Sequence, residues 1–347
     1  MKQLGFMGGF VFAAVLALAS PVLAAGITVG VSWADSTSAR WRFDEAAIKS
    51  ALDSAGASYL GTNAHASDIR QLNDINHLVA AGVDALIVQP QDPVKLETLL
   101  ASVIRRGIPV ISYDRLIETP QILYLSFSNR EVGRMQARAI LAAQPKGNYA
   151  FIKGDPTDPN ADFLFDGQID VLVDALASGD IVNIGDVYTK RWAADVAKRQ
   201  MQLLLDENDN NIDAVIGSSD LIAGGVIAAL AERGLAGRVP VSGQDADPEA
   251  LNRIALGTQT VSVWKDTRQL GRKAGEFAVL LAEGGTIDDI PDIVRFNGGS
   301  RGVEVNSYFL APTLITRETL DIVIDSGWAT RETVCKDVAP GTVAICD

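Results

Sequence analysis

The sequence predicts an α/β protein with two similar lobes, each built around a parallel sheet. Short apolar segments alternate with amphipathic segments along most of the 347 residues. Glycine follows several of the amphipathic segments, as it does at helix C-termini, where the residue takes a positive φ. The alternation is interrupted near Ser128 and then starts again, so we expect one lobe before this point and a second lobe after it.

The composition is typical of a folded protein. Apolar residues make up 48% of the chain and charged residues 21%, which argues against disorder. The formal net charge of −13 argues against a nucleic-acid surface, which needs clustered cations. Two cysteines and two histidines leave little room for zinc modules or histidine-based catalysis. We therefore expect no nucleic acid, no metal and no cofactor.

Residues 1–24 predict a cleavable export signal. Lys2 precedes a wholly apolar or glycine stretch at residues 6–19, and small residues lead up to Ala24, after which we expect cleavage. The alternative is a membrane anchor, but the apolar stretch is marginal in length, Pro21 interrupts its end and no basic cluster follows. After export, Cys335 and Cys346 would meet an oxidising compartment, and we expect them to close a structural disulfide that ties down the C-terminal tail.

The first lobe opens with an apolar run at residues 27–33, which predicts a buried strand. Residues 44–55 predict a helix that Gly56 can end, and Ser67 can cap a second helix that Gly82 closes. The remaining elements of this lobe are a helix at 96–106 and strands at 85–88, 109–113 and 123–127.

The second lobe repeats this order. Predicted helices at 129–143, 162–177, 193–205 and 221–233 lead to strands at 149–153, 181–188, 214–217 and 240–243. A last helix at 266–283 and strand-like segments beyond it indicate that the chain crosses between the lobes more than once. We therefore assign residues 25–127 and 266–297 to the N-terminal lobe and residues 128–265 and 298–347 to the C-terminal lobe. A single sheet or barrel is the alternative, but a TIM barrel needs eight regular units, which the break at 120–128 fits poorly.

Charged, amide and indole side chains follow the predicted strands. Ligands of parallel α/β sheets bind beyond the carboxyl ends of the strands, so we expect these side chains to converge. The candidates are Arg40, Trp41, Asp114, Arg115, Asp155, Asp158, Asn160, Trp192, Ser218, Ser219, Asp220, Gln244, Asp245 and Lys265. Because sugar hydroxyls both donate and accept, and sugar C–H faces pack on indole rings, this set predicts a neutral polyhydroxylated ligand between Trp41 and Trp192. No convincing glycine-rich phosphate nest is present.

Each candidate also has a structural explanation. Either tryptophan could be a core residue, Asp114 and Arg115 could form an exposed ion pair, and Asp220 and Asp245 could cap helices, which we favour for Asp220. Two further patterns are set aside. Residues 206–217 resemble a calcium loop but lack its glycine and final glutamate. The Ala-Gly-Gly run at 223–225 lacks dinucleotide-binding spacing and indicates close helix packing.

Several of these strand-end segments resemble the ribose/galactose-type periplasmic sugar-binding proteins, in particular the branch of D-xylose-binding proteins and multiple-monosaccharide receptors. They are residues 38–41, 111–115, 126–129, 158–161, 242–247 and 257–260. The resemblance covers roughly residues 27–327. It implies a type I periplasmic binding protein, with two Rossmann-like lobes, a three-segment hinge and an aldopyranose bound in the cleft.

The resemblance also implies a role for each matched residue. Trp41 and Trp192 would stack on the two faces of the sugar. Hydroxyls would be bound by Arg40, Asp114 and Arg115 from the N-terminal lobe, by Asp158, Asn160 and Asp245 from the C-terminal lobe, and by Lys265 at the hinge. Ser219 stands where the xylose-binding branch has asparagine, so one hydroxyl contact is either lost or bridged by water.

The function expected from these features is a periplasmic receptor for xylose or a similar aldose that closes about its ligand and delivers it to an inner-membrane ABC permease. We expect a monomer. One alternative output is a sensor or chemoreceptor. A secreted glycosidase using Asp114 and Asp158 is a further alternative, disfavoured because neighbouring cations would keep both carboxylates ionised. A sugar-responsive transcription regulator would need an N-terminal helix-turn-helix, whereas this sequence predicts an export signal there.

Overall fold

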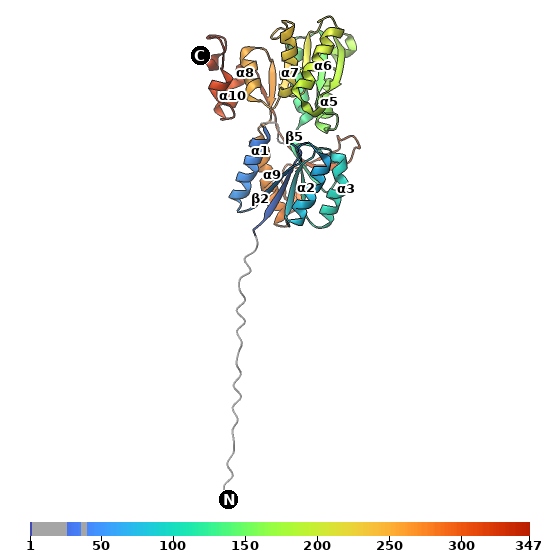
Figure 1. Ribbon diagram of the computed structural model, residues 1–347, viewed down its shortest axis with the longest axis vertical. Helices are drawn as coiled ribbons and strands as arrows, with labels where there is room; N and C mark the ends of the chain where they lie inside the picture. Colours follow the sequence, from blue (N-terminus) through green and yellow to red (C-terminus); the bar gives the residue numbers. More distant parts are fainter. Residues whose placement is uncertain (2–25, 36–39) are drawn as a thin grey trace.

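The chain forms two α/β lobes stacked along the long axis of the molecule (Figure 1). This computed structural model describes residue 1 and residues 26–35 and 40–347, so the expected export signal lies outside the described residues. Among the residues described, no helix has both the length and the apolar character that crossing a membrane requires.

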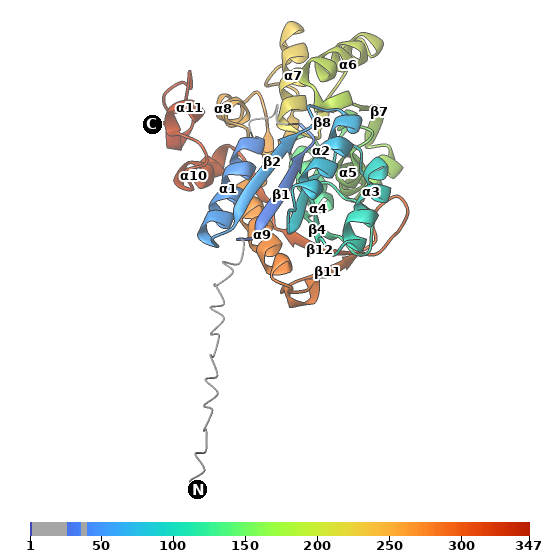
Figure 2. The same cartoon turned by 60° about the horizontal axis from the view of Figure 1, so that its bottom comes forward.

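The sheet of the first lobe has the order β11-β12-β5-β4-β3-β1-β2, parallel except for the β11–β12 pair. Its strands are β1 (Thr28–Trp33), β2 (Ser58–Asn63), β3 (Ala85–Gln89), β4 (Val110–Tyr113), β5 (Leu123–Phe127), β11 (Val294–Phe296) and β12 (Val305–Leu310). Its helices are α1 (Arg40–Ser54), α2 (Asp68–Ala80), α3 (Pro93–Arg105) and α9 (Thr267–Ala282). The apolar faces of α1 and α9 cover one side of this sheet, and those of α2 and α3 the other (Figure 2).

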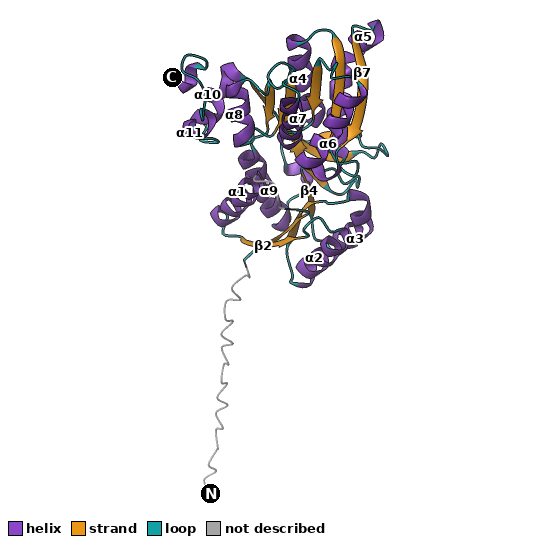
Figure 3. Ribbon diagram, turned by 45° about the horizontal axis from the view of Figure 1, so that its top comes forward, coloured by secondary structure: helices purple, strands orange, loops and turns teal. Residues whose placement is uncertain are grey.

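The second sheet has the order β13-β10-β9-β8-β6-β7, with β13 antiparallel to β10. Its strands are β6 (Gly147–Lys153), β7 (Ile181–Tyr188), β8 (Ala214–Gly217), β9 (Val241–Gln244), β10 (Val261–Trp264) and β13 (Thr313–Ile315). Its helices are α4 (Asn129–Ala143), α5 (Pro159–Ser178), α6 (Ala194–Glu207), α7 (Asp220–Glu232) and α8 (Pro248–Leu256), which flank the strands (Figure 3). The short helices α10 (Leu320–Asp325) and α11 (Arg331–Val334) follow, and the Cys335–Cys346 disulfide closes the tail.

The two-lobed parallel architecture confirms the predicted fold class, but particular elements differ from the expected ones. The first helix begins at Arg40 rather than at residue 44, and neither β2 nor α8 is predicted by the alternation. The expected lobe boundary at residue 297 is wrong for β12, which pairs with β5 in the first sheet. The chain returns to the second lobe only between β12 and β13. The expected boundary is wrong because the sequence of a short strand does not indicate which strand it pairs with.

Glycines let several helices cross closely. A Cβ at Gly133 of α4 would lie 2.0 Å from the carbonyl oxygen of Leu164, and a Cβ at Gly167 of α5 would lie 2.0 Å from that of Arg130. A Cβ at Gly225 of α7 would lie 2.1 Å from the carbonyl oxygen of Ala194. The expectation that the Ala-Gly-Gly run at 223–225 serves helix packing is therefore confirmed at Gly225.

Candidate functional site

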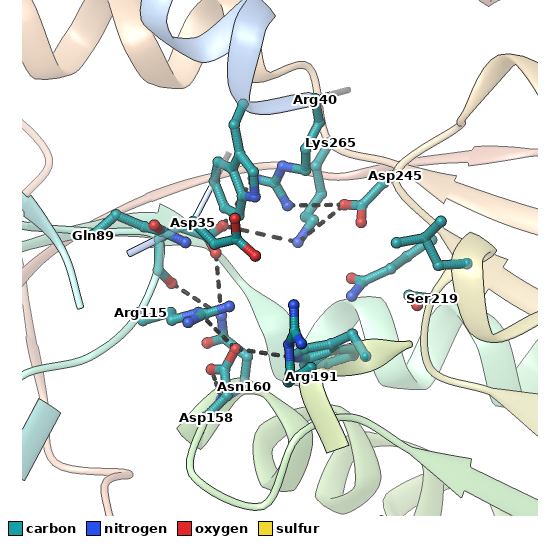
Figure 4. A pocket seen from close by; sticks show the side chains of 15 residues that line it. Asp35, Arg40, Gln89, Arg115, Asp158, Asn160, Arg191, Ser219, Asp245 and Lys265 are labelled. Atoms are coloured by element: carbon teal, nitrogen blue, oxygen red, sulfur yellow. Dashed lines mark hydrogen bonds and ion pairs between the residues drawn. The ribbon is translucent and has the colours of Figure 1, made fainter. Parts of the chain in front are cut away.

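The carboxyl ends of strands from both sheets face a cleft between the lobes, with about 660 Å³ of empty space that is partly open to solvent (Figure 4). The cleft is lined by Asp35, Arg40, Trp41, Gln89, Asp114, Arg115, Asp158, Asn160, Arg191, Trp192, Ser219, Leu221, Gln244, Asp245 and Lys265. The structure thus brings together the nine residues for which the resemblance implies contact with a ligand, and Ser219 beside them. Their part in binding stays a prediction.

Arg40 is the central cation of the cleft. It stands in the first turn of α1, where its Nη2 atom lies 3.0 Å from Asp114 Oδ1 and its Nη1 atom lies 3.0 Å from Asp245 Oδ1. Its guanidinium also lies over the neighbouring Trp41 ring, 4.2 Å from the centroid. Asp114 follows β4 and Asp245 follows β9, so this single side chain joins the two lobes (Figure 4).

Lys265 completes this charged group from the segment that links β10 to α9. Its Nζ atom lies 3.3 Å from Asp245 Oδ1 and 3.9 Å from Asp114 Oδ1. Burial alone would raise the pKa of Asp114, but Arg40, Lys265 and Arg115 together hold it below its ordinary value. Asp114 is buried, and its ion pairs are with Arg40 and Lys265, so the exposed Asp114–Arg115 ion pair considered above is excluded.

A second ion pair crosses the cleft. Arg115 Nε lies 2.7 Å from Asp158 Oδ2, and the indole Nε1 of Trp192 donates to the same oxygen at 3.2 Å. Burial raises the pKa of Asp158, opposed by Arg115, and Asp114 raises it further. The pKa of Asp114 is thus shifted in the direction expected from the neighbouring cations, whereas burial shifts that of Asp158 in the opposite direction.

Trp192 owes its position to local backbone geometry. Arg191 and Trp192 both take left-handed φ values, 60° and 54°, and Asp155 accepts a hydrogen bond from the Arg191 backbone N–H. A Cβ at Gly154 would lie 2.1 Å from the indole, so the absence of a side chain at Gly154 makes room for the ring. Trp192 is half-buried and Trp41 is buried, and both line the cleft.

The polar residues of the second lobe divide into cleft residues and structural ones. Ser219, not Asp220, is the N-cap of α7, accepting a hydrogen bond from Ile222 N at 3.3 Å. The prediction that Asp220 caps this helix is therefore wrong by one residue. Asp220 still has a structural role, because it is buried and accepts hydrogen bonds from Gln259 and Ser262. The capping explanation for Asp245 is also wrong, because the N-cap position of α8 is Asp247.

Asn160 connects the lobes through hydrogen bonds. Its Nδ2 donates to the carbonyl oxygen of Asp114 at 3.1 Å, while its Oδ1 accepts from Asn129 Nδ2 at 2.9 Å. This side chain therefore has a fixed orientation at the edge of the cleft, with its amide aimed at Asp114.

Four residues of the cleft lining are not among the candidates from the sequence: Asp35, Gln89, Arg191 and Leu221. Among the described side chains that line the cleft, Gln89 Nε2, Gln244 Oε1, Arg40 Nε and Arg115 Nε are buried without a hydrogen bond, although Arg115 Nε forms the ion pair with Asp158. Gln89 is the last residue of β3, directly after the strand predicted at residues 85–88. The expectation that ligands bind beyond the carboxyl ends of strands therefore applies to Gln89 as well. Unpartnered buried polar atoms are costly, and here they are available to a bound molecule.

Comparisons with known proteins agree with this geometry. Residues 29–286 match the model of the periplasmic binding protein domain. The chain is 36% identical to a D-xylose-binding periplasmic protein of Haemophilus influenzae over 89% of this chain and 92% of that protein. It is 30% identical to the multiple sugar-binding periplasmic receptor ChvE of Rhizobium radiobacter, over 86% and 90% of the two chains. A solved ABC transporter solute-binding protein from Clostridium phytofermentans, with bound β-D-glucose, is similar at a TM-score of 0.80 and 28% identity, covering 88% of this chain and 99% of that one.

Proposed function

The chain belongs to the periplasmic binding protein family, a family of solute-binding proteins, and on that premise we propose that it binds an aldose and delivers it to an ABC importer. The observation that carries this proposal is the charge balance of the cleft. Its described lining holds four cations (Arg40, Arg115, Arg191 and Lys265) and four anions (Asp35, Asp114, Asp158 and Asp245). A neutral ligand rich in hydroxyl groups fits such a lining, because every hydroxyl can accept from a cation and donate to a carboxylate.

The ligand we propose is an aldopyranose, xylose or a similar pentose or hexose. Trp41 and Trp192 would pack on opposite faces of its ring, and the free Gln89 and Gln244 atoms would add contacts to its oxygens. At Ser219 we propose a water-bridged hydroxyl contact, since this short side chain already accepts the capping bond of α7.

Binding would favour the closed arrangement of the lobes. The contacts of Arg40 with Asp245, of Arg115 with Asp158 and of Asn160 with Asp114 all cross the cleft, so they exist only when the lobes are close together. A ligand that touches both lobes shifts the equilibrium toward that state. In our proposal the permease recognises the closed protein, which reaches the periplasm as a monomer through a cleavable N-terminal signal.

Isothermal titration calorimetry of the purified chain against pentoses, hexoses and uronic acids tests the proposal. We expect tight one-to-one binding of at least one neutral aldose. Mass spectrometry of any co-purified ligand provides an independent identification. Absence of binding to every sugar of the panel would overturn the proposal, and sustained turnover of aryl glycosides would revive the glycosidase alternative.

A further inference from the structure

The tail beyond the segment matched by the family model packs around one tryptophan, Trp328. This residue is 7% exposed and belongs to an apolar cluster with Trp264, Leu251 and Val334 of the second lobe. Arg268 of α9 lies over both indoles, with its Cζ atom 5.4 Å from the Trp328 centroid, and donates to the carbonyl oxygen of Ser326 at 2.8 Å. Asn252 of α8 donates to the carbonyl oxygens of Val334 at 3.0 Å and Lys336 at 2.7 Å, so α11 rests beside α8 (Figure 2).

The indole of Trp328 reaches the segment that carries Asp245. Its Nε1 donates to the carbonyl oxygen of Ala246 at 2.7 Å. Asp245 and Ala246 both have left-handed φ values, 95° and 53°, which non-glycine residues adopt only when their surroundings hold them there. The backbone N–H groups of Asp245 and Ala246 donate to Val263 and Ser262 on β10, and that of Asp247 donates to Asp220 Oδ2 at 3.0 Å. The Trp328 hydrogen bond is thus the one that ties the turn to the tail.

The ring of Trp328 also reaches the opposite lobe. Its centroid lies 5.0 Å from that of Phe43, which stands on α1 one turn after Arg40. Phe43 is 41% exposed, so its ring is a surface side chain whose described aromatic contact is with Trp328. A contact between α1 and the tail crosses from one lobe to the other, as the Arg40–Asp245 pair does, and is lost when the lobes separate.

We propose that Trp328 is a positioning residue for the binding site. Its N–H holds the Asp245 turn in the orientation that meets Arg40, and its ring docks on Phe43 when the lobes close, which stabilises the closed form at a point outside the cleft. The inference rests on the proposed sugar-binding function, since it assigns the tail a part in that same closure.

Two variants separate the two roles. Trp328→Phe keeps an aromatic ring and removes the N–H donor, whereas Phe43→Ala removes the ring contact between α1 and Trp328 and leaves the contacts of Arg268 in place. Leu203→Ala is the control, because Leu203 is 60% exposed on α6 and lies away from the cleft lining. With the aldose identified by calorimetry, stopped-flow measurements should give about tenfold weaker binding for Trp328→Phe and about fivefold faster release with unchanged association for Phe43→Ala. A purely structural role would not confine the Phe43→Ala effect to release.

Hydrogen–deuterium exchange of the 245–247 segment tests the positioning role without any sugar. We expect at least tenfold faster exchange in Trp328→Phe and no change in Phe43→Ala or Leu203→Ala. Unchanged exchange in Trp328→Phe would overturn the positioning role, and unchanged sugar release in Phe43→Ala would overturn the closure contact. If the wild-type protein binds no sugar at all, the proposed function fails, while the exchange result still decides whether Trp328 holds the turn.

Discussion

At the scale of single residues, the cleft depends on charges that are buried and paired across it. Arg40 is 5% exposed, and burial of such a cation without partners would be strongly unfavourable. Asp114 and Asp245 offset that cost, and their attraction raises the pKa of Arg40 above its ordinary value although burial alone would lower it. Residues of this kind bind hydroxyl groups without needing a change in protonation.

Replacement of Trp41 by alanine should weaken sugar binding at least tenfold. The indole is 9% exposed and lines the cleft, so its removal takes away an apolar face on which sugar C–H groups can pack. Calorimetry with the best aldose measures the effect. Because Trp41 also packs against Trp33, with ring centroids 5.9 Å apart, thermal unfolding of the variant must confirm that it is folded at the temperature used. Unchanged affinity would mean that Trp41 is a core residue only.

A second prediction at this scale concerns Asp44, which is fully buried beside Arg40 and accepts a hydrogen bond from the Tyr113 hydroxyl. Burial raises its pKa from 3.8 to about 7, against the opposing effects of Arg40 and Tyr113. The folded protein therefore holds this proton more tightly than the unfolded chain does. The stability it contributes is fully present below pH 3.8 and is lost as the pH rises through about 7.

Asp44→Asn should remove this dependence on pH. Between pH 4 and pH 8, the free energy of unfolding of the wild type should fall relative to that of the variant, by about 1–4 kcal/mol. Urea unfolding at several pH values measures the difference, and Asp53→Asn, at an exposed position of the same helix, is the matched control. Parallel pH profiles for wild type and Asp44→Asn would show that Asp44 has no such role.

At the scale of elements, close crossings of helices set the shape of the second lobe. Alanine normally stabilises a helix relative to glycine by about 1 kcal/mol. At Gly133 the added Cβ would meet a backbone oxygen at 2.0 Å, so α4 and α5 would have to move apart. We expect Gly133→Ala to lower the free energy of unfolding by about 2 kcal/mol or more.

Gly224→Ala is the matched control for this prediction. Gly224 lies within helix α7, where its Cβ would approach only the end of the Arg253 side chain, at 3.3 Å. We expect its stability to remain within about 1 kcal/mol of the wild type. Equal effects of the two substitutions in urea unfolding would contradict the close-crossing explanation.

The elements that could be predicted from the sequence are those encoded by local patterns of residues. Buried strands such as β3 and β4 are mostly apolar, and glycines with positive φ, such as Gly82 and Gly107, do follow the helices where they are expected. Strand β2 escapes prediction because it is an edge strand with polar, half-exposed side chains. The pairing of β12 with β5 joins residues 183 positions apart, such as Asn306 and Leu123, and no local pattern encodes it.

The candidate site was more predictable than the sheet edges for a physical reason. Parallel strands place their carboxyl ends at one edge, so a residue such as Asp114 or Asp158 can be assigned to that edge from its strand alone. Arg191 could not be found in this way, because it lies in a left-handed turn that gives no sequence signal at a non-glycine residue. The pairing of Arg115 with Asp158 depends on how the lobes meet, which the sequence of either lobe leaves open.

At the scale of the whole molecule, three segments connect the lobes, and the tail adds contacts outside the cleft. The segments run from β5 to α4, from β10 to α9 and from β12 to β13. Lys265 lies in the second of them, so a charged cleft residue is part of the connection that must bend. In the proposed function, ligand binding and lobe movement would therefore be coupled through the same short piece of chain.

The disulfide of the tail provides the last prediction. Cys335 and Cys346 are separated by 11 positions, and a cross-link of this span stabilises a protein by about 3 kcal/mol, mainly by restricting the unfolded chain. The double variant Cys335→Ser/Cys346→Ser should lose about that much unfolding free energy, measured in urea, and reduction of the wild type should reproduce the loss.

Sugar should then add the same increment to both proteins, about 2.7 kcal/mol at a hundred times the dissociation constant. The reason is that Arg268, Trp264 and Ala246 hold Trp328 directly, without help from the disulfide. A smaller increment in the double variant would mean instead that the cross-link itself shapes the binding site. A stability equal to that of the wild type would show that the tail does not unfold together with the lobe on which it packs.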